Sequence, residues 1–140
     1  MDRTHGHSPY DNTGVSYALG TPVVPALAPV LSAMIAGADA GVDRYTSPPD
    51  ARNYLERHYV PTGELGMPVI TVHNRWDYLV PFAHESAFRD AVQAAGATDM
   101  LLQRTVPDYG HCSNAALRTT VLQSFQDLVA WSTTGVKPGS

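Results

Sequence analysis

The chain has 140 residues, of which 44% are hydrophobic, and a formal net charge of −4 at pH 7. This length fits one domain with a modest hydrophobic core, and the nine scattered basic residues exclude the concentrated basic surface that is typical of nucleic-acid-binding proteins. A single cysteine, Cys112, excludes an internal disulfide and a zinc motif built from cysteines.

The N-terminal region has two features that bear on location. Its first residues are polar and contain no secretory signal, so we expect a cytoplasmic protein. Residues 12–38 contain no charged side chain, and a stretch of this length could cross a bilayer. Prolines and glycines interrupt it, and its most apolar run, Val30–Ala36, is far shorter than the ~20 residues of a spanning helix. We therefore predict no membrane contact and a segment that is buried or covered by a partner.

Residues 1–66 are predicted to form a loop-rich segment with one short helix. The helix is expected at Pro49–Tyr59, because the sequence Pro48-Pro49-Asp50 is a typical helix start. Tyr54, Leu55 and His58 fall on one face of this helix. Together with the rest of the chain, this segment is expected to make a single domain.

Residues 67–140 have a regular pattern of strands and helices. Met67–His73 is a short run of β-branched residues, which is typical of a buried strand. Pro81–Ala95 has helical spacing, Met100–Val106 resembles a second strand, and Asn114–Ser132 is a second amphipathic helix. The predicted order is therefore strand, helix, strand, helix.

Each of the two predicted helices in this part has an apolar stripe. In the first, the stripe consists of His84, Ala87, Phe88, Ala91, Val92 and Ala95. In the second, it consists of Leu117, Val121, Leu122, Phe125, Leu128 and Val129. Ser113 or Asn114 can cap the second helix, and Gly135 is expected to end it.

This order predicts an α/β fold in which residues 67–140 form a β-α-β-α unit with two parallel strands. Two parallel strands are not stable alone, because parallel sheets are buried on both faces and need more neighbours. The first strand would leave an unpaired edge, and apolar edges of this kind associate. We therefore predict that the sheet is completed by oligomerisation, most simply in a homodimer.

Two loops that follow the predicted strands carry the candidate catalytic residues. Asp77 lies in the loop after the first strand, and His111 lies in the loop after the second. Because working residues gather beyond the carboxyl ends of parallel strands, we expect these two side chains to lie within hydrogen-bonding reach. The carboxylate would hold the imidazole Nδ1–H and stabilise the charged ring while Nε2 accepts a proton.

The segment PVITVHNRWDYLVP, followed after about 30 residues by YGHC and an amphipathic helix, resembles the C-terminal segment of bacterial α/β-hydrolases of the esterase type. In that family the acid lies in an H-x-x-x-D-x-x-V-P loop and the histidine in a later G-H loop, and Asp77 and His111 fall on these positions. The stretches GHSPYDNTGVSYALG and RNYLERHYVPTGEL resemble the insertion that often precedes the acid loop.

The resemblance implies a partial α/β-hydrolase sheet and an esterase-like site with Asp77 and His111 as catalytic residues. The family's nucleophile is a serine in a G-x-S-x-G elbow, and the sequence contains no such motif. The chain is therefore expected to be a family segment that lacks the nucleophile elbow and the strands before the acid loop.

Three functions remain open at the level of the sequence. The first is hydrolysis of a small-molecule ester, with no cofactor, by the Asp77–His111 pair acting on water or with a nucleophile from elsewhere. The second is a hydrolase of esters or phosphate esters that depends on zinc or manganese, with His73, Asp77 and His111 as ligands and His58 or Asp108 as a further one. The third is a non-catalytic fragment that needs a partner. A nucleophilic pair of Cys112 with His111 is a further alternative.

Overall fold

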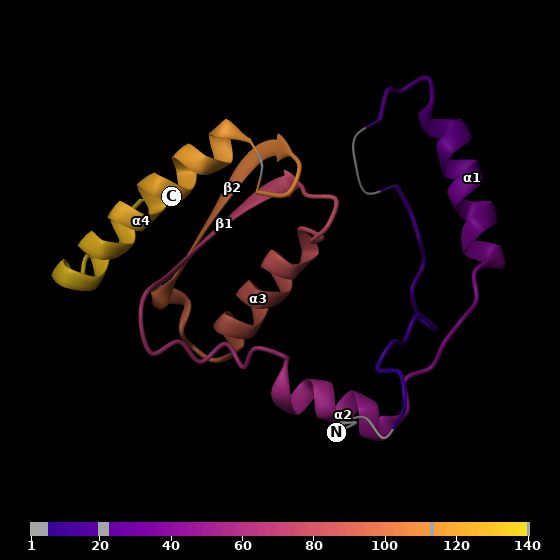
Figure 1. The fold of residues 1–140 in the computed structure, drawn as a ribbon, viewed down its shortest axis with the longest axis horizontal. Coiled ribbons are helices and arrows are strands. Elements are labelled where there is room, and N and C mark those ends of the chain that lie inside the picture. The colour runs from indigo at the N-terminus through magenta and orange to yellow at the C-terminus, as the bar shows by residue number, and fades with distance from the viewer. Residues whose placement is uncertain (1–5, 20–22, 113, 140) are drawn as a thin grey trace. The chain divides into compact units, whose positions relative to one another are not determined.

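The computed structural model describes residues 6–19, 23–112 and 114–139. Within these ranges the fold is mixed α/β, with four α-helices and a two-stranded parallel sheet (Figure 1). Contacts between residues divide the chain into two compact units, Met1–Val60 and Pro61–Ser140. The sequence suggested a division near Gly66, so the loop that leads into the first strand belongs to the second unit.

The first unit contains two helices, α1 (Ala28–Gly41) and α2 (Pro49–His58). Helix α2 was predicted, whereas α1 lies in a segment that was expected to be loop because prolines punctuate it. Pro29 does not break α1, because it lies in the first turn, where no intrahelical partner is needed for its missing N–H. Within the described residues, α1 has no buried residue, although Leu31, Ile35 and Asp39 are half-buried. Among the described residues, no helix is long and apolar enough to cross a membrane.

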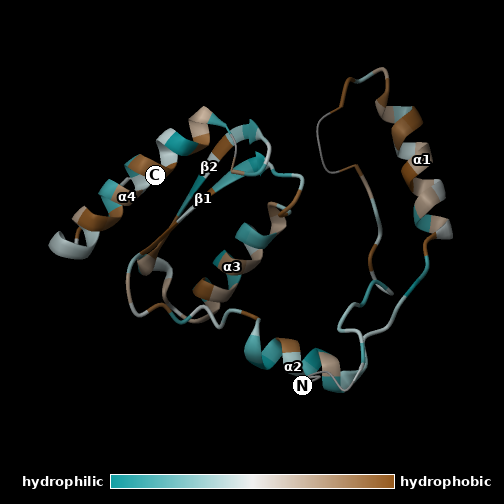
Figure 2. Cartoon of the chain, viewed as in Figure 1, coloured by the Kyte–Doolittle hydropathy of each residue, from teal (hydrophilic) through white to brown (hydrophobic). Residues whose placement is uncertain are grey.

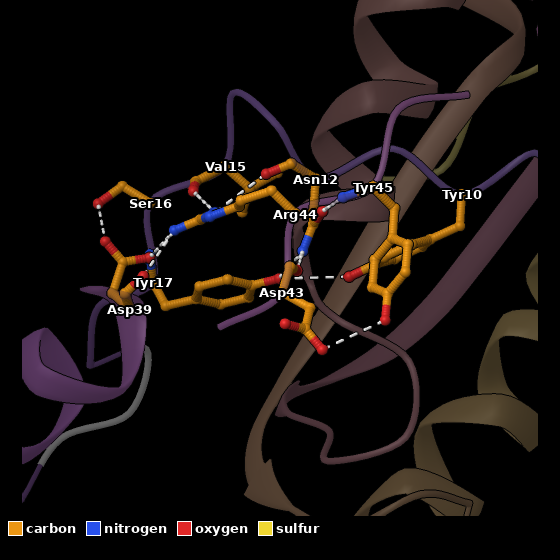
Figure 3. A network of polar contacts seen from close by, with 9 residues as sticks. All are labelled: Tyr10, Asn12, Val15, Ser16, Tyr17, Asp39, Asp43, Arg44 and Tyr45. Carbon is orange, nitrogen blue, oxygen red and sulfur yellow. Dashed lines mark hydrogen bonds and ion pairs between the residues drawn. The ribbon is translucent and has the colours of Figure 1, made fainter. Parts of the chain in front are cut away.

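Polar contacts hold the loops of the first unit together (Figure 3). The side chain of Asn12 is buried, and it donates to the Asp43 carbonyl at 2.9 Å and accepts from the Tyr45 N–H at 2.7 Å. The guanidinium of Arg44 donates to the Asn12 carbonyl at 3.0 Å and pairs with Asp39 at 2.8 Å. The segment around Asn12 is therefore fixed to the segment after α1 by hydrogen bonds rather than by an apolar core.

The second unit follows the predicted order. It contains β1 (Val69–Trp76), α3 (Ala83–Ala94), a short 3-10 turn (Thr98–Met100), β2 (Leu101–Tyr109) and α4 (Ala115–Thr134). Both strands continue past the residues at which they were expected to end. Figure 2 shows that their first residues are hydrophobic and that their carboxyl ends are hydrophilic, which is why the pattern of apolar residues ended early.

The two strands pair in parallel, with Val69 opposite Leu101 and Asn74 opposite Val106. Helices α3 and α4 cover opposite faces of this sheet (Figure 1). Alternate side chains of the strands accordingly face different helices, as Gln103 contacts α3 and Arg104 contacts α4. The buried apolar residues of this unit are Val92, Leu101, Leu102, Val106, Leu117 and Trp131.

The inward face of α3 differs from the predicted stripe. His84 and Ala87, which were expected to face the core, are exposed, whereas Val92 of the same stripe is buried as predicted. Glu85 takes an inward position instead, because its carboxylate accepts hydrogen bonds from Thr71 of β1 and Gln103 of β2. A charged side chain on this face is tolerated because both strands supply it with polar partners.

The inward face of α4 also differs from the predicted stripe. Its buried residues are Leu117, which belongs to the predicted stripe, and Ser124 and Trp131, which do not. Most of the predicted stripe is exposed, namely Val121, Leu122, Phe125 and Val129. The polar Ser124 is buried because its hydroxyl accepts a hydrogen bond of 3.1 Å from Arg104, so the packing of α4 depends on a partner that the helix sequence does not contain.

The ends of α4 are as predicted. The side chain of Asn114 accepts a hydrogen bond of 2.6 Å from the N–H of Leu117, so Asn114 is the N-cap. The other cap candidate, Ser113, lies outside the described residues. At the other end of the helix, Gly135 donates its N–H to the Trp131 carbonyl.

Candidate functional site

The candidate site lies where the two strands end. The Trp76 and Tyr109 rings stack with centroids 4.8 Å apart, and the N–H of Gly110 donates to the Trp76 carbonyl at 3.3 Å. The register of the strands is irregular between Asn74 and Trp76. These contacts hold the ends of the two strands together, so the loops that follow them start side by side.

Asp77 and His111 meet across the two loops, as the order of the strands predicted. The distance between Asp77 Oδ2 and His111 Nδ1 is 2.7 Å. A carboxylate only accepts hydrogen bonds, so Nδ1 carries the proton and Nε2 of the neutral ring has a free lone pair. The Asp77 side chain is 4% exposed and that of His111 is 37% exposed. This arrangement has a buried carboxylate behind an imidazole that solvent can reach.

Backbone donors fix the Asp77 carboxylate from its other side. Its Oδ1 accepts the N–H of Leu79 at 2.8 Å and that of Val80 at 2.9 Å, so Oδ2 is left for His111. Burial raises the pKa of Asp77, but the Val80 N–H, the His111 ring and the Leu79 N–H outweigh it and lower the pKa to about 2. Asp77 is therefore ionised at neutral pH, the form that can hold an imidazole proton.

The lowered pKa of Asp77 predicts how the stability of the second unit depends on pH. The ionised carboxylate stabilises the fold above its ordinary pKa, and this contribution is lost as the pH falls from about 4 to about 2. Asp77→Asn lacks the contribution at every pH, so the gap in unfolding free energy between the natural chain and this variant should narrow over that range. Urea denaturation at a series of pH values measures the gap. Asp90→Asn is the control for lost charge, and a gap that widens towards pH 2 would contradict the prediction.

His73 approaches the same carboxylate. Its Nε2 is 3.8 Å from Asp77 Oδ2, and its Nδ1–H donates to the Asn74 carbonyl at 2.9 Å. Nε2 is buried and has no hydrogen-bond partner, and the Phe82 ring lies beside the imidazole at 5.7 Å. His73 therefore lies at the edge of the site, and its hydrogen bond orients it toward Asp77.

The residues of the metal hypothesis are only partly brought together. His73 and His111 both approach Asp77, but no group of three or more such side chains in the described ranges is arranged to hold a metal ion. Asp108 is used locally, because its carboxylate accepts the N–H of Tyr109 at 2.7 Å. His58 lies on α2 in the first unit, where its ring packs against Tyr54 at 4.7 Å.

Sequence reasoning missed one polar residue beside the pair. Asn74 is 1% exposed, and its side-chain Nδ2 donates to the Gly110 carbonyl at 2.6 Å. The available signal was a polar amide at the end of an apolar strand.

Cys112, the residue after His111, is exposed and has a φ of 55°, a conformation that few residues other than glycine adopt.

No family model, curated protein or solved structure matches this chain.

The chemistry available to Asp77 and His111 follows from their geometry. A buried, ionised carboxylate orients one ring nitrogen of His111 and leaves the other free to accept a proton. That is the arrangement of a general base.

Proposed function

We propose that this chain hydrolyses small-molecule esters, with His111 as the general base and Asp77 as the residue that orients it. The 2.7 Å contact between His111 Nδ1 and Asp77 Oδ2 carries the proposal. The resemblance to the acid and histidine loops of α/β-hydrolases supports it, because both residues fall on the family's positions in the family's order.

In the proposed reaction His111 takes a proton from water through Nε2. The water oxygen attacks the ester carbonyl carbon, and the resulting imidazolium returns its proton to the departing alcohol. Asp77 stabilises the imidazolium, because its carboxylate is ionised and already bonded to Nδ1. Water takes the role that the serine of a G-x-S-x-G elbow has in the family, since the sequence contains no such motif.

A metal-dependent reaction at the same place is the second candidate. The unpartnered Nε2 of His73 near Asp77 favours it, because a zinc or manganese ion is a partner that this nitrogen could bind. The ion would acidify a bound water and supply the nucleophile. His73, Asp77 and His111 would then be ligands rather than an orienting group and a base.

Hydrolysis of a chromogenic ester, measured with and without a chelator, tests the two candidates. Activity that the chelator leaves unchanged supports the Asp77–His111 pair acting on water. Activity that the chelator abolishes and zinc or manganese restores supports the metal reaction. A chain with no activity under either condition, tested over several acyl lengths, would contradict both and favour a non-catalytic fragment that needs a partner.

We also propose that the free edge of β1 is covered by a second copy of the chain. Beside this edge an apolar groove is lined by Ile70, Val72, Val121, Ser124, Phe125 and Leu128. Phe125 is 65% exposed and Val121 is 46% exposed, so the groove presents large apolar groups to solvent. Edge-to-edge pairing of two β1 strands about a twofold axis would satisfy the free backbone groups and bury these side chains.

Phe125→Lys is expected to convert the dimer to a monomer, because the substitution places a charge in a groove that the second copy would desolvate. Sedimentation velocity at micromolar concentration measures the change. Val136→Lys is the control, since Val136 is 70% exposed and lies outside the groove. A natural chain that sediments as a compact monomer near 15.1 kDa would contradict the dimer.

A further inference from the structure

Asn74 connects the end of β1 to the loop that carries His111. Its Nδ2 donates to the carbonyl of Gly110 at 2.6 Å, and the residue is almost fully buried. A carbonyl only accepts, so the amide orientation is fixed with Nδ2 toward Gly110, and Oδ1 remains without a partner. This buried side chain therefore makes a single hydrogen bond, and its partner is the loop that carries His111.

Gly110 is the residue through which this bond reaches the catalytic pair. The carbonyl that Asn74 holds belongs to the peptide group that leads directly into His111. Gly110 has a φ of 97°, so the chain turns sharply at this point. Rotation of this peptide group would move the His111 ring relative to Asp77. Asp77 itself is held in the loop after β1 by the N–H groups of Leu79 and Val80.

The loop has a second tie on the preceding peptide group. Asn114 donates to the Tyr109 carbonyl at 3.1 Å, while its other side-chain atom caps α4. Two asparagine amides therefore hold successive carbonyls immediately before His111. Asn114 serves the helix as well, whereas the single side-chain hydrogen bond of Asn74 goes to the loop.

We infer that Asn74 is a positioning residue for His111: through the Gly110 carbonyl it holds the imidazole with Nδ1 against Asp77 and Nε2 facing the reaction. The catalytic consequence rests on the proposed function, but the positioning itself does not. Misplacement of a catalytic group by about 1 Å costs on the order of 10²-fold in rate, so a partial loosening of this loop is expected to cost about tenfold.

The test replaces Asn74 with Leu, which has nearly the same shape and no hydrogen-bond donor. The tautomer of His111 is read from its ring ¹⁵N shifts at a pH where the imidazoles are neutral. The natural chain should have the proton on Nδ1, and Asn74→Leu should move a substantial fraction of the molecules to the Nε2–H tautomer. Asp77→Asn provides the reference spectrum for a ring that has lost its orienting carboxylate.

Val92→Ala is the matched control, because it removes packing from a fully buried position without touching either loop. It should lower the melting temperature and leave the His111 tautomer unchanged. If Asn74→Leu does not fold, Asn74→Ala is measured in the same way. For ester hydrolysis, Asn74→Leu should lower kcat about tenfold with little change in KM, and Val92→Ala should change neither.

The possible outcomes separate the positioning role from the proposed activity. A shift of the tautomer in the Asn74 variant but not in Val92→Ala supports positioning, even if the natural chain proves to have no esterase activity. A His111 ring that stays in the Nδ1–H form in the folded Asn74 variants overturns the inference. An equal shift in Val92→Ala also overturns it, because the effect would then follow from lost stability alone.

Discussion

Replacing His111 with Ala is expected to lower ester hydrolysis by roughly 10²–10⁴-fold, the usual contribution of general acid–base catalysis. The variant removes the ring whose Nδ1 is bound to Asp77 and whose Nε2 accepts the proton. Initial rates with a chromogenic ester measure the loss. The same loss is expected if His111 is a metal ligand, and the chelator experiment separates that case.

His84→Ala is the matched control for this variant. His84 is an exposed histidine at the start of α3, and it takes no part in the contacts described above between the two strand-exit loops. It should retain full activity, while circular dichroism should show that both variants remain folded. A folded His111→Ala protein with unchanged activity would mean that the reaction takes place elsewhere in the chain.

Gly63→Ala is expected to destabilise the second unit by roughly 2–4 kcal/mol. Gly63 has a φ of 79°, which costs free energy for any residue with a Cβ. The added Cβ would also overlap the backbone of α3, at the carbonyl of Ala91 and the nitrogen of Val92. Backbone atoms of a helix cannot move aside as a flexible side chain can, so the loop or the helix must shift.

Gly66→Ala is the matched control, because a Cβ at Gly66 meets no atom within 4 Å. Urea denaturation followed by circular dichroism gives the two free energies of unfolding. The control should lie within about 0.5 kcal/mol of the natural chain. Equal stabilities for the two variants would show that the segment before β1 does not pack against α3 at this point.

The order of elements in the second unit could be predicted because each has a strong local pattern. The β-branched run that begins near Val69 indicates a strand, and the spacing in α3 and α4 indicates helices. The ends of the strands could not be predicted in the same way. The polar residue Asn74 still pairs with β2, since the ladder uses backbone groups that hydropathy does not report.

The position of helix α1 was not predicted, because prolines and glycines usually interrupt helices. The position of a proline matters more than its presence, and Pro29 lies in the first turn. The inward faces of α3 and α4 were predicted only in part: Val92 and Leu117 of the predicted stripes are buried, but each helix also turns a polar residue inward. Glu85 and Ser124 face inward because Gln103 and Arg104 on β2 supply hydrogen bonds, and the sequence of a helix alone does not contain that information.

The candidate pair itself could be predicted, because strand order alone brings Asp77 and His111 to the same edge of a parallel sheet. Its supporting contacts could not. The donors to Asp77 are the backbone amides of Leu79 and Val80, which every residue possesses. The role of Asn74 depends on a hydrogen bond to the Gly110 carbonyl, 36 residues further along the chain, which no local pattern reports.

The parallel pairing of β1 with β2 has a consequence for how the unit forms. The chain must pass through the whole of α3 before the second strand can meet the first, so conformational entropy is lost before any ladder bond is gained. Helix α3 forms from neighbouring residues and shortens the gap that remains. We therefore expect the sheet to close only after α3 has formed, and the contact between His111 and Asp77 to form no earlier than the sheet, because His111 lies beyond the final paired residue of β2. On a ribosome, Asp77 would leave the exit tunnel well before the histidine that completes its pair.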